Sequence, residues 1–405
     1  MNTGLKPRLF TLIVIVSCLT GLNSCRKDDD RVDDREKLEE FVSLGSYTIQ
    51  ELQALVNISG YDFPLSVIKY NVEVYKLTYF TNYKGDKVTA SGIVVIPVTS
   101  DSLSMVSIHH GTIVALKDAP SVQPFFSEEI ILSSILASSG FISVFPDYLG
   151  FGSSSSLRHP YYVEEFAASS VTDNLIAAKE LVKIKNIMFN GKLFLTGYSQ
   201  GGYVTMAVHK YIDQYGLQDF KLVASFPAAG GYDVKEMQEY LFGLQNYDDP
   251  YYIAYLLSAY KTTFGWTQPF TYFFNEPYAG KMPGLFNGAL SGSQINAQLS
   301  DTIPKLVNGD LLANIDTDPK YKFIIDAMSE NSLTDWIPKT PIYMYHGDAD
   351  KSVPYQNSVS VYQQLLSNGA SADILHLITL QGAGHSSGVE PYLDDVIQRI
   401  LDLNE

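Results

Sequence analysis

Ser199 stands in a segment whose residue types and spacing suit an activated hydroxyl. The segment Gly197-Tyr198-Ser199-Gln200-Gly201-Gly202 follows the Leu-Phe-Leu-Thr strand pattern of residues 193–196 and opens a stretch of helical pattern. A G-x-S-x-G sequence at such a strand-to-helix turn exposes its serine on a tight bend. The free N–H groups of the following helix favour a negative charge that develops there. The pattern predicts Ser199 as a nucleophile and the backbone N–H of Gln200 as one donor to an oxyanion.

A serine hydroxyl is a weak nucleophile and needs an adjacent base, which a third group must orient. Of the seven histidines, His385 lies in the glycine-rich segment 382–388, after the last predicted strand. A loop there can reach over the end of a sheet to the serine, whereas His209 on the following helix and His376 within a strand cannot. An acid is expected between serine and histidine in chain order. Residues 345–354 offer two candidates for it, Asp348 and Asp350.

The elements that must position these residues alternate between strand and helix from about residue 70 onward. Apolar or alternating strands are predicted around a turn at 84–86 and at 105–111, 141–148, 192–199, 221–230, 341–350 and 372–384. Helical periodicity marks residues 127–140, with Ser127 as N-cap, and 163–184, 201–216 and 391–403. This alternation predicts an α/β fold, with a mostly parallel central sheet covered by helices on both faces.

One region interrupts the alternation. Between Tyr240 and Phe286 there are 15 aromatic residues among 47, against 13% in the whole chain. We therefore expect residues 232–338 to form a helical, aromatic-rich cap inserted into a core of residues 46–231 and 339–405. Part of the aromatic set is expected to anchor this cap and the rest to line a cleft above Ser199: Tyr251, Tyr252, Tyr255, Tyr260, Phe264, Trp266, Phe270, Tyr272, Phe273 and Phe274.

With these motifs the chain resembles the α/β-hydrolase superfamily, from about residue 70 to the C-terminus. The H-G-x-x-D-x-x-V-P arrangement at 346–354 is similar to its acid loop, which implies that Asp350 is the acid and Asp348 a loop-shaping neighbour. The chain order serine, acid, histidine is the one expected for this fold. His109-His110-Gly111-Thr112 resembles its oxyanion loop. The resemblance implies that the N–H of Thr112 is the second oxyanion donor, and that His110 braces the loop.

Within the superfamily the chain is most similar to secretory lipases and esterases, which implies a serine hydrolase that cleaves carboxylic esters. Serine peptidases and glycan acetyl or feruloyl esterases have the same triad and remain alternatives. Peptidases usually need charged groups to hold a peptide terminus, whereas the insertion is mainly aromatic. A non-catalytic glycan-binding lipoprotein on a retired hydrolase fold is a further alternative, although such retirement normally removes a triad member. The Asp147-Tyr148-x-Gly150-x-Gly152 segment is expected mainly to make a turn.

The N-terminal segment predicts where in the cell the protein is located. Lys6 and Arg8 precede an apolar run of 14 residues, which is short of the ~20 needed to span a bilayer. Leu22-Asn23-Ser24-Cys25 resembles a bacterial lipobox, which implies a signal peptide over 1–24 and a lipid on Cys25. Residues 26–40 carry 13 charges, so 25–45 is expected to be a solvated acidic tether. The protein is thus expected in the bacterial cell envelope, anchored to the outer membrane.

The composition and the motifs limit the classes of partner and cofactor that we expect. The net charge of −16 repels phosphate backbones, so no nucleic acid is expected. The two cysteines, Cys18 and Cys25, both precede the body of the chain and exclude a disulfide framework or a cysteine metal site within it. There is no H-E-x-x-H sequence and no nucleotide-binding glycine motif, so neither a metal nor a cofactor is expected. The expected partner is a small-molecule or lipid ester substrate, and no obligate protein partner is inferred.

Overall fold

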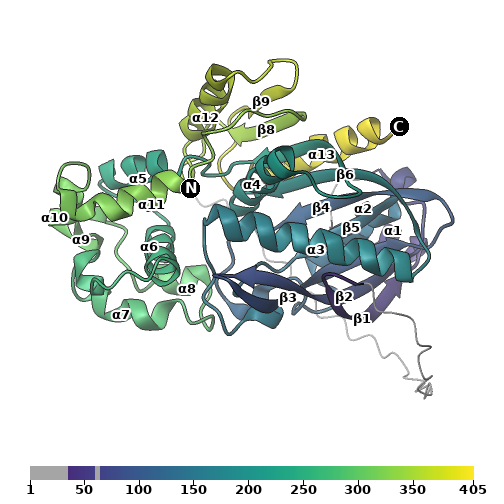
Figure 1. Cartoon of the computed structure of the whole chain (residues 1–405), viewed down its shortest axis with the longest axis horizontal. Coiled ribbons are helices and arrows are strands. Elements are labelled where there is room, and N and C mark those ends of the chain that lie inside the picture. Colours follow the sequence, from purple (N-terminus) through teal and green to yellow (C-terminus); the bar gives the residue numbers. More distant parts are fainter. Residues whose placement is uncertain (1–34, 60–63) are drawn as a thin grey trace. The chain divides into compact units, whose positions relative to one another are not determined.

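The computed structural model describes residues 35–59 and 64–405. The predicted signal peptide, Cys25 and the tether as far as residue 34 lie outside the described residues. The described part of the chain contains a nine-stranded sheet in the order β1-β2-β3-β5-β4-β6-β7-β8-β9 (Figure 1). Its strands are β1 Leu38–Tyr47, β2 Val72–Tyr83, β3 Asp86–Pro97, β4 Ser102–His109, β5 Phe141–Pro146, β6 Met188–Tyr198, β7 Lys221–Ala228, β8 Ile342–Gly347 and β9 Leu375–Leu380.

The six strands from β5 to β9 in this order run parallel to their neighbours, while β1, β2 and β3 pair antiparallel and β3 joins β5 antiparallel. Parallel strands need crossover connections, and these supply the helices that cover the sheet. The predicted α/β class with a mostly parallel sheet is confirmed. Because the carboxyl ends of parallel strands lie at one edge, the loops after β4, β6, β8 and β9 lie at the same edge of the sheet.

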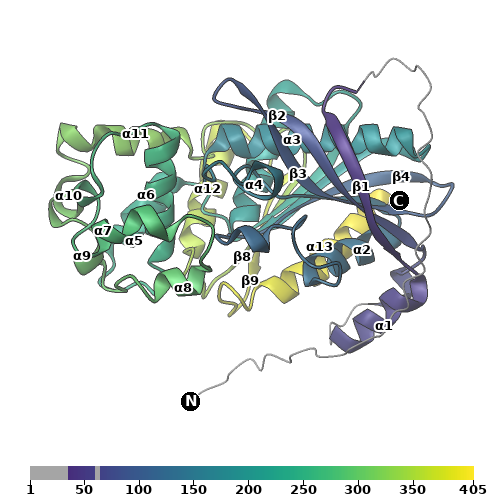
Figure 2. The ribbon, with the colours of Figure 1, turned by 90° about the horizontal axis from the view of Figure 1, so that it is seen from below.

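Helices cover both faces of the sheet. Successive side chains of one strand point to opposite faces and pack against different helices. On β6, Leu193 and Leu195 belong to the core that also holds α3 and α4, whereas Phe194 between them packs in the core with α13. Figure 2 shows α3 on one side of the sheet and α2 and α13 on the other. The covering helices are α1 Ile49–Ser59, α2 Glu128–Ser138, α3 Glu164–Ile184, α4 Gln200–Tyr215, α12 Tyr355–Asn368 and α13 Val389–Asn404.

The sheet begins earlier than the sequence pattern indicates. Strand β1 starts at Leu38, which is buried, and pairs antiparallel with β2. A carboxylate on α3 holds this start, since Glu180 accepts backbone N–H bonds from Glu36, Lys37 and Leu38. This corrects the expected end of the tether at residue 45. The charges of the segment fit a strand because β1 is an edge strand, most of whose side chains stay exposed or half-buried.

The segment between β7 and β8 folds as a group of helices beyond the carboxyl edge of the sheet (Figures 1 and 2). We call residues 232–338 the cap. Its helices are α5 Val234–Gly243, α6 Tyr251–Thr263, α7 Tyr278–Leu285, α8 Gly292–Asn296, α9 Ile303–Leu306, α10 Gly309–Asn314 and α11 Lys322–Glu330. Among the described residues, none of the helices is both long and apolar enough to cross a bilayer.

Candidate active site

Ser199 occupies the single residue between β6 and α4, with a backbone φ of +59°. This left-handed conformation is uncommon for a residue with a side chain and is typical of functional bends. The flanking glycines are required by packing. A Cβ atom on Gly197 would overlap the carbonyl of Gly201, and one on Gly201 would overlap the carbonyl of His109. The G-x-S-x-G spacing therefore lets two backbone segments approach while the serine side chain faces the edge of the sheet.

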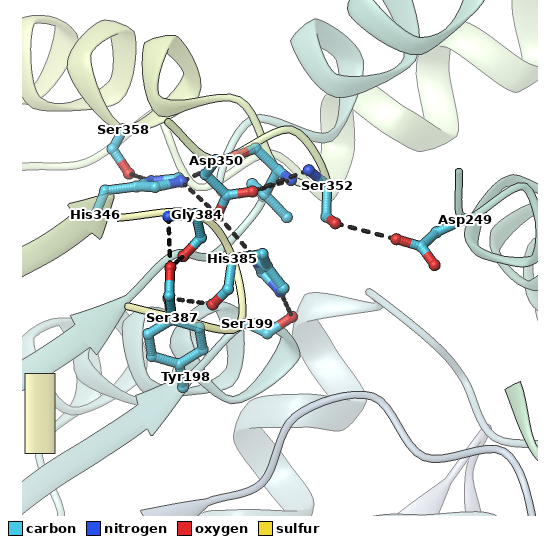
Figure 3. A network of polar contacts seen from close by, with 12 residues as sticks. Tyr198, Ser199, Asp249, His346, Asp350, Ser352, Ser358, Gly384, His385 and Ser387 are labelled. Atoms are coloured by element: carbon cyan, nitrogen blue, oxygen red, sulfur yellow. Dashed lines mark hydrogen bonds and ion pairs between the residues drawn. The ribbon is translucent and has the colours of Figure 1, made fainter. Parts of the chain in front are cut away.

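The structure brings Ser199, His385 and Asp350 together from three different strand ends (Figure 3). The Nε2 atom of His385 lies 2.9 Å from the Oγ of Ser199, and its Nδ1 lies 2.6 Å from the Oδ2 of Asp350. A carboxylate can only accept, so Nδ1 carries the proton. In the neutral ring Nε2 is then free to accept the serine proton. This arrangement can withdraw a proton from the Ser199 hydroxyl while it attacks an electrophile.

The carboxylate of Asp350 is fully enclosed, and its side chain has 0% exposure. Its Oδ1 accepts backbone N–H bonds from Ser352 and Val353 at 2.9 and 3.0 Å. Burial by itself raises the pKa of Asp350, but hydrogen bonds from His346 and His385 outweigh it and lower the pKa to about 2. The group is therefore a carboxylate across the neutral range. The other candidate, Asp348, is exposed and accepts the backbone N–H of Gly382.

Two side chains of the cap bind the loop that carries Asp350. The Oγ of Ser352 donates to Asp249 at 3.0 Å, and the hydroxyl of Tyr247 donates to the carbonyl of Ser352 at 2.9 Å. Figure 3 shows Asp249 at the far end of the polar chain that leads through Ser352 and Asp350 toward His385. The cap thus contacts the acid loop by directional bonds, which residue spacing alone did not indicate.

The two residues predicted as oxyanion donors lie on the loop after β4 and at the start of α4. A Cβ atom on Gly111 would lie 3.8 Å from the Cβ of Ser199, so the β4 loop passes beside the serine. Thr112 follows directly, and its hydroxyl is 2.9 Å from that of Tyr161. Gln200 is the first residue of α4, where N–H groups have no intrahelical acceptor. Both backbones are thus close to Ser199, and their role as oxyanion donors stays a prediction.

His110 and Asp147 support the loop after β4 through hydrogen bonds and ring stacking. The ring of His110 stacks on Tyr148, and its nitrogens lie 2.8 Å from the carbonyl of Gly111 and 3.2 Å from that of Asp147. The buried carboxylate of Asp147 accepts hydrogen bonds from Ser91 and Ser121. The segment that begins at Asp147 thus joins β3, β5 and the loop after β4.

The sequence did not indicate a buried contact that His159 makes with Gln200, beside the bend that carries Ser199. The Nδ1 of His159 lies 2.6 Å from the carbonyl of Leu149, which can only accept, so Nδ1 is protonated. Its Nε2 then accepts a 2.7 Å bond from the side-chain amide of Gln200. His159 therefore holds the side chain of Gln200, the residue that follows Ser199. Its loop position between Arg158 and Pro160 contained no signal for this contact.

A cavity with about 60 Å³ of free space opens onto Ser199. Its floor includes Ser199 and Gly231, and the cap supplies most of the remaining wall. Apart from Gln238, that wall consists of aliphatic, methionine and aromatic side chains from α5, α6, α11 and the nearby loop: Val234, Met237, Leu241, Phe242, Tyr247, Tyr252, Ile253, Leu256, Leu257 and Met328.

The expectation that many of the aromatic residues of the cap line a cleft above Ser199 is largely wrong. Of the ten aromatic residues proposed from the sequence, Tyr252 lines this cavity. Tyr255, Tyr260, Phe273 and Phe274 are instead buried in the packing of the cap and its contact with the core. Tyr255, for example, stacks on Tyr161 with ring centroids 4.5 Å apart. The cap uses most of its rings in its own packing and presents mainly aliphatic side chains to the cavity, with Phe242, Tyr247 and Tyr252 beside them.

We expect the stability of the protein to fall in mild acid because of buried histidines. Burial lowers the pKa of His109 and of His159 to about 3. Between about pH 6 and pH 3 the unfolded chain binds these protons and the folded one does not, so the free energy of unfolding decreases as pH falls. The slope is up to about 1.4 kcal/mol per pH unit for each histidine.

Urea unfolding at pH 6.5, 5.5 and 4.5 measures this slope. The hydroxyl of Thr205 donates to the carbonyl of Gly201, so it accepts from Nδ1 of His109, and Nε2 then accepts from Ser107. The His109→Gln variant retains a donor and an acceptor but cannot be protonated in this range, so its slope should be shallower. Equal slopes in the variant and the wild type would contradict the assignment to His109.

The sheet order, the serine at a strand-to-helix bend and the hydrogen-bonded histidine and aspartate together define the α/β-hydrolase class of fold. The sequence pattern of the Alpha/beta hydrolase family matches residues 120–399. That span is more than half of the chain, and the chain therefore belongs to this family.

Solved structures of hydrolases superimpose over most of the chain. The esterase LipA from Xanthomonas oryzae, which degrades rice cell walls, is 25% identical, with a TM-score of 0.77 over 90% of this chain and 97% of its own. A protein of Legionella pneumophila assigned to the hydrolases is 24% identical, with a TM-score of 0.82 over 91% and 99%. Candida antarctica lipase A shares the fold at 16% identity and a TM-score of 0.62, over 86% and 77%. No curated protein sequence matches the chain.

Proposed function

We propose that this protein is a serine hydrolase that cleaves carboxylic esters. The observation that carries the proposal is the hydrogen-bonded chain from Ser199 through His385 to the ionised Asp350, at the floor of an apolar cavity. Membership of the α/β hydrolase family supports it, as does the similarity to an esterase.

In the proposed reaction the Oγ of Ser199 attacks the ester carbonyl while Nε2 of His385 takes its proton. The N–H groups of Gln200 and Thr112 stabilise the oxyanion. The intermediate collapses to an acyl-serine as His385 returns the proton to the leaving alcohol. Water then attacks the acyl-serine with His385 again as base, which releases the acid and restores Ser199. Asp350 holds the ring in the required tautomer and stabilises its charged form.

The cavity favours an ester over a peptide. A peptidase of this fold would need charged groups beside the serine to hold a peptide terminus, whereas the wall of this cavity consists mainly of apolar side chains. The complete set of serine, histidine and aspartate argues against a purely sugar-binding role, because nothing in sugar capture requires their alignment.

Covalent labelling by a fluorophosphonate tests the proposal. Wild-type protein should be labelled at Ser199, and an excess of a p-nitrophenyl ester present during the reaction should slow the labelling by competition. A protein that folds but is neither labelled nor able to release p-nitrophenol from any short ester would refute the proposed function.

We expect the rate to depend on acyl length. The cavity of about 60 Å³ that opens onto Ser199 is lined mainly by apolar side chains, so the methylene groups of a short acyl chain can be buried in it. Each buried methylene contributes about 0.8 kcal/mol until the space is full. The value of kcat/KM for p-nitrophenyl esters should therefore rise from acetate to butyrate. A steep preference for acetate would instead indicate a deacetylase of glycans.

We also propose that the protein is anchored to the outer membrane through a lipid on Cys25, on the strength of the apolar run and the Leu22–Cys25 sequence. Replacement of Cys25 by Ser should move the protein from the membrane pellet to the soluble fraction after cell fractionation. Metabolic labelling with a clickable fatty acid should be lost in the same variant. Retention of either signal would rule out Cys25 as the attachment site.

A further inference from the structure

Gln238 is a polar residue on an otherwise apolar face of the cap helix α5. It lies four residues after Val234 and three before Leu241, so the three side chains share one side of the helix. All three are buried and line the cavity that opens onto Ser199. A leucine or methionine would serve this position if packing were its only role, as at the neighbouring Met237. The amide therefore calls for a partner.

The protein itself supplies none for the amide oxygen. Gln238 is only 4% exposed, and its Oε1 is buried without a hydrogen-bond partner. Buried polar groups are almost always paired, and an unpaired one destabilises the folded state. The last torsion of a glutamine side chain is soft, so the amide can present either its oxygen or its nitrogen to the cavity. A ligand that enters the cavity with a hydroxyl group can donate to the one and accept from the other.

We propose that the acyl group of the substrate is a short hydroxyacyl chain whose hydroxyl binds Gln238. This inference rests on the proposed ester hydrolysis at Ser199 and names its substrate class. Ser199 and Gln238 line the same cavity of about 60 Å³, so a short acyl chain carried by Ser199 would lie in the space that the amide borders. The rest of the lining is mainly apolar, with serine and tyrosine hydroxyls among it, and suits the carbon atoms of such a chain. Hydrolysis consumes one water and releases the hydroxy acid and an alcohol.

An isosteric pair of substrates isolates the hydroxyl. Ethyl 3-hydroxybutyrate and ethyl 3-methylbutyrate differ by a hydroxyl in place of a methyl group and have nearly the same shape. With acid release followed in a pH-stat, wild-type protein should show a kcat/KM about tenfold higher for the hydroxy ester, because the methyl group leaves the amide unpaired. A wild-type ratio at or below one overturns the inference without any variant.

The Gln238→Leu variant should remove or reverse this preference. The ratio of the two substrates is measured within one preparation, so it does not depend on the amount of active enzyme. As a matched control, Met237→Leu alters the neighbouring wall and keeps the amide, and its ratio should stay near that of the wild type. A preference that persists in Gln238→Leu would assign the hydroxyl to another group and overturn the inference.

A binding measurement separates this inference from the proposed function. Calorimetric titration of the Ser199→Ala protein with each ethyl ester should show tighter binding of the hydroxy ester, and the added Gln238→Leu change should abolish the difference. If that preference is present but no ester is hydrolysed by the wild type, the hydroxyacyl site stands and the proposed function fails. If esters are hydrolysed and neither assay shows a preference, the proposed function stands and the hydroxyacyl site is refuted.

Discussion

Replacement of Ser199 by alanine is expected to lower kcat/KM for p-nitrophenyl butyrate by about a thousandfold or more. The reason is that the variant has no atom to form the acyl intermediate, while the neighbouring donors and the cavity remain. Folding should be unaffected, because alanine fits the same backbone and the Oγ of Ser199 bonds to His385 rather than to the core. Melting temperature and circular dichroism, measured beside the kinetics, check that the loss is catalytic.

Ser386 offers a matched control in the loop that carries the base. It is an exposed serine adjacent to His385, and the Ser386→Ala change removes a hydroxyl of the same kind without touching the hydrogen-bonded chain. Its kcat/KM should stay within about twofold of the wild type. If Ser199→Ala retained half of the activity, Ser199 could not be the nucleophile.

Replacement of Asp350 by asparagine should reduce kcat by on the order of a thousandfold and change KM little. The side chain is fully enclosed, so the amide must take the place of the carboxylate. An amide nitrogen at the Oδ2 position would donate to Nδ1 of His385 and move the ring proton to Nε2, where it could no longer accept from Ser199. The kinetics of p-nitrophenyl butyrate hydrolysis measure both constants.

Asp348 is the matched control for this change. It lies two residues earlier in the same loop, is exposed, and bonds to the backbone of Gly382. Asp348→Asn retains an oxygen that can accept this bond, so a loss of a few-fold at most is expected. If Asp348→Asn proved the more damaging change, the acid would have to be reassigned to position 348.

The parts of the site that follow strands were accessible to sequence reasoning, because glycine-rich turns after apolar strands indicate where a sheet ends. Ser199 and His385 could be proposed on that basis alone. The choice of Asp350 over Asp348 needed the resemblance to a family. The spacing of two aspartates in one loop does not say which of them turns inward, whereas the structure buries one and exposes the other.

Other features depend on tertiary contacts that no local pattern indicates. Strand β1 is an edge strand whose side chains are mostly exposed or half-buried, and its start is held by Glu180, which lies more than a hundred residues away in the chain. The aromatic richness of the cap was visible, but composition does not reveal which rings face a cavity and which pack together. Gln238 could have been found as the polar member of an apolar helix face, had α5 been delimited beforehand.

The hydrogen bonds from the cap to Ser352 have a consequence for protein engineering. The junctions of the cap with the core, near residues 231 and 339, look like convenient breakpoints for chimeras with other family members. A transplanted cap that lacks an acceptor where Asp249 stands, or a hydroxyl where Tyr247 stands, would leave the acid loop without two of its restraints. Modular exchange of substrate pockets in this protein therefore requires that residues 247, 249 and 352 be exchanged as one unit.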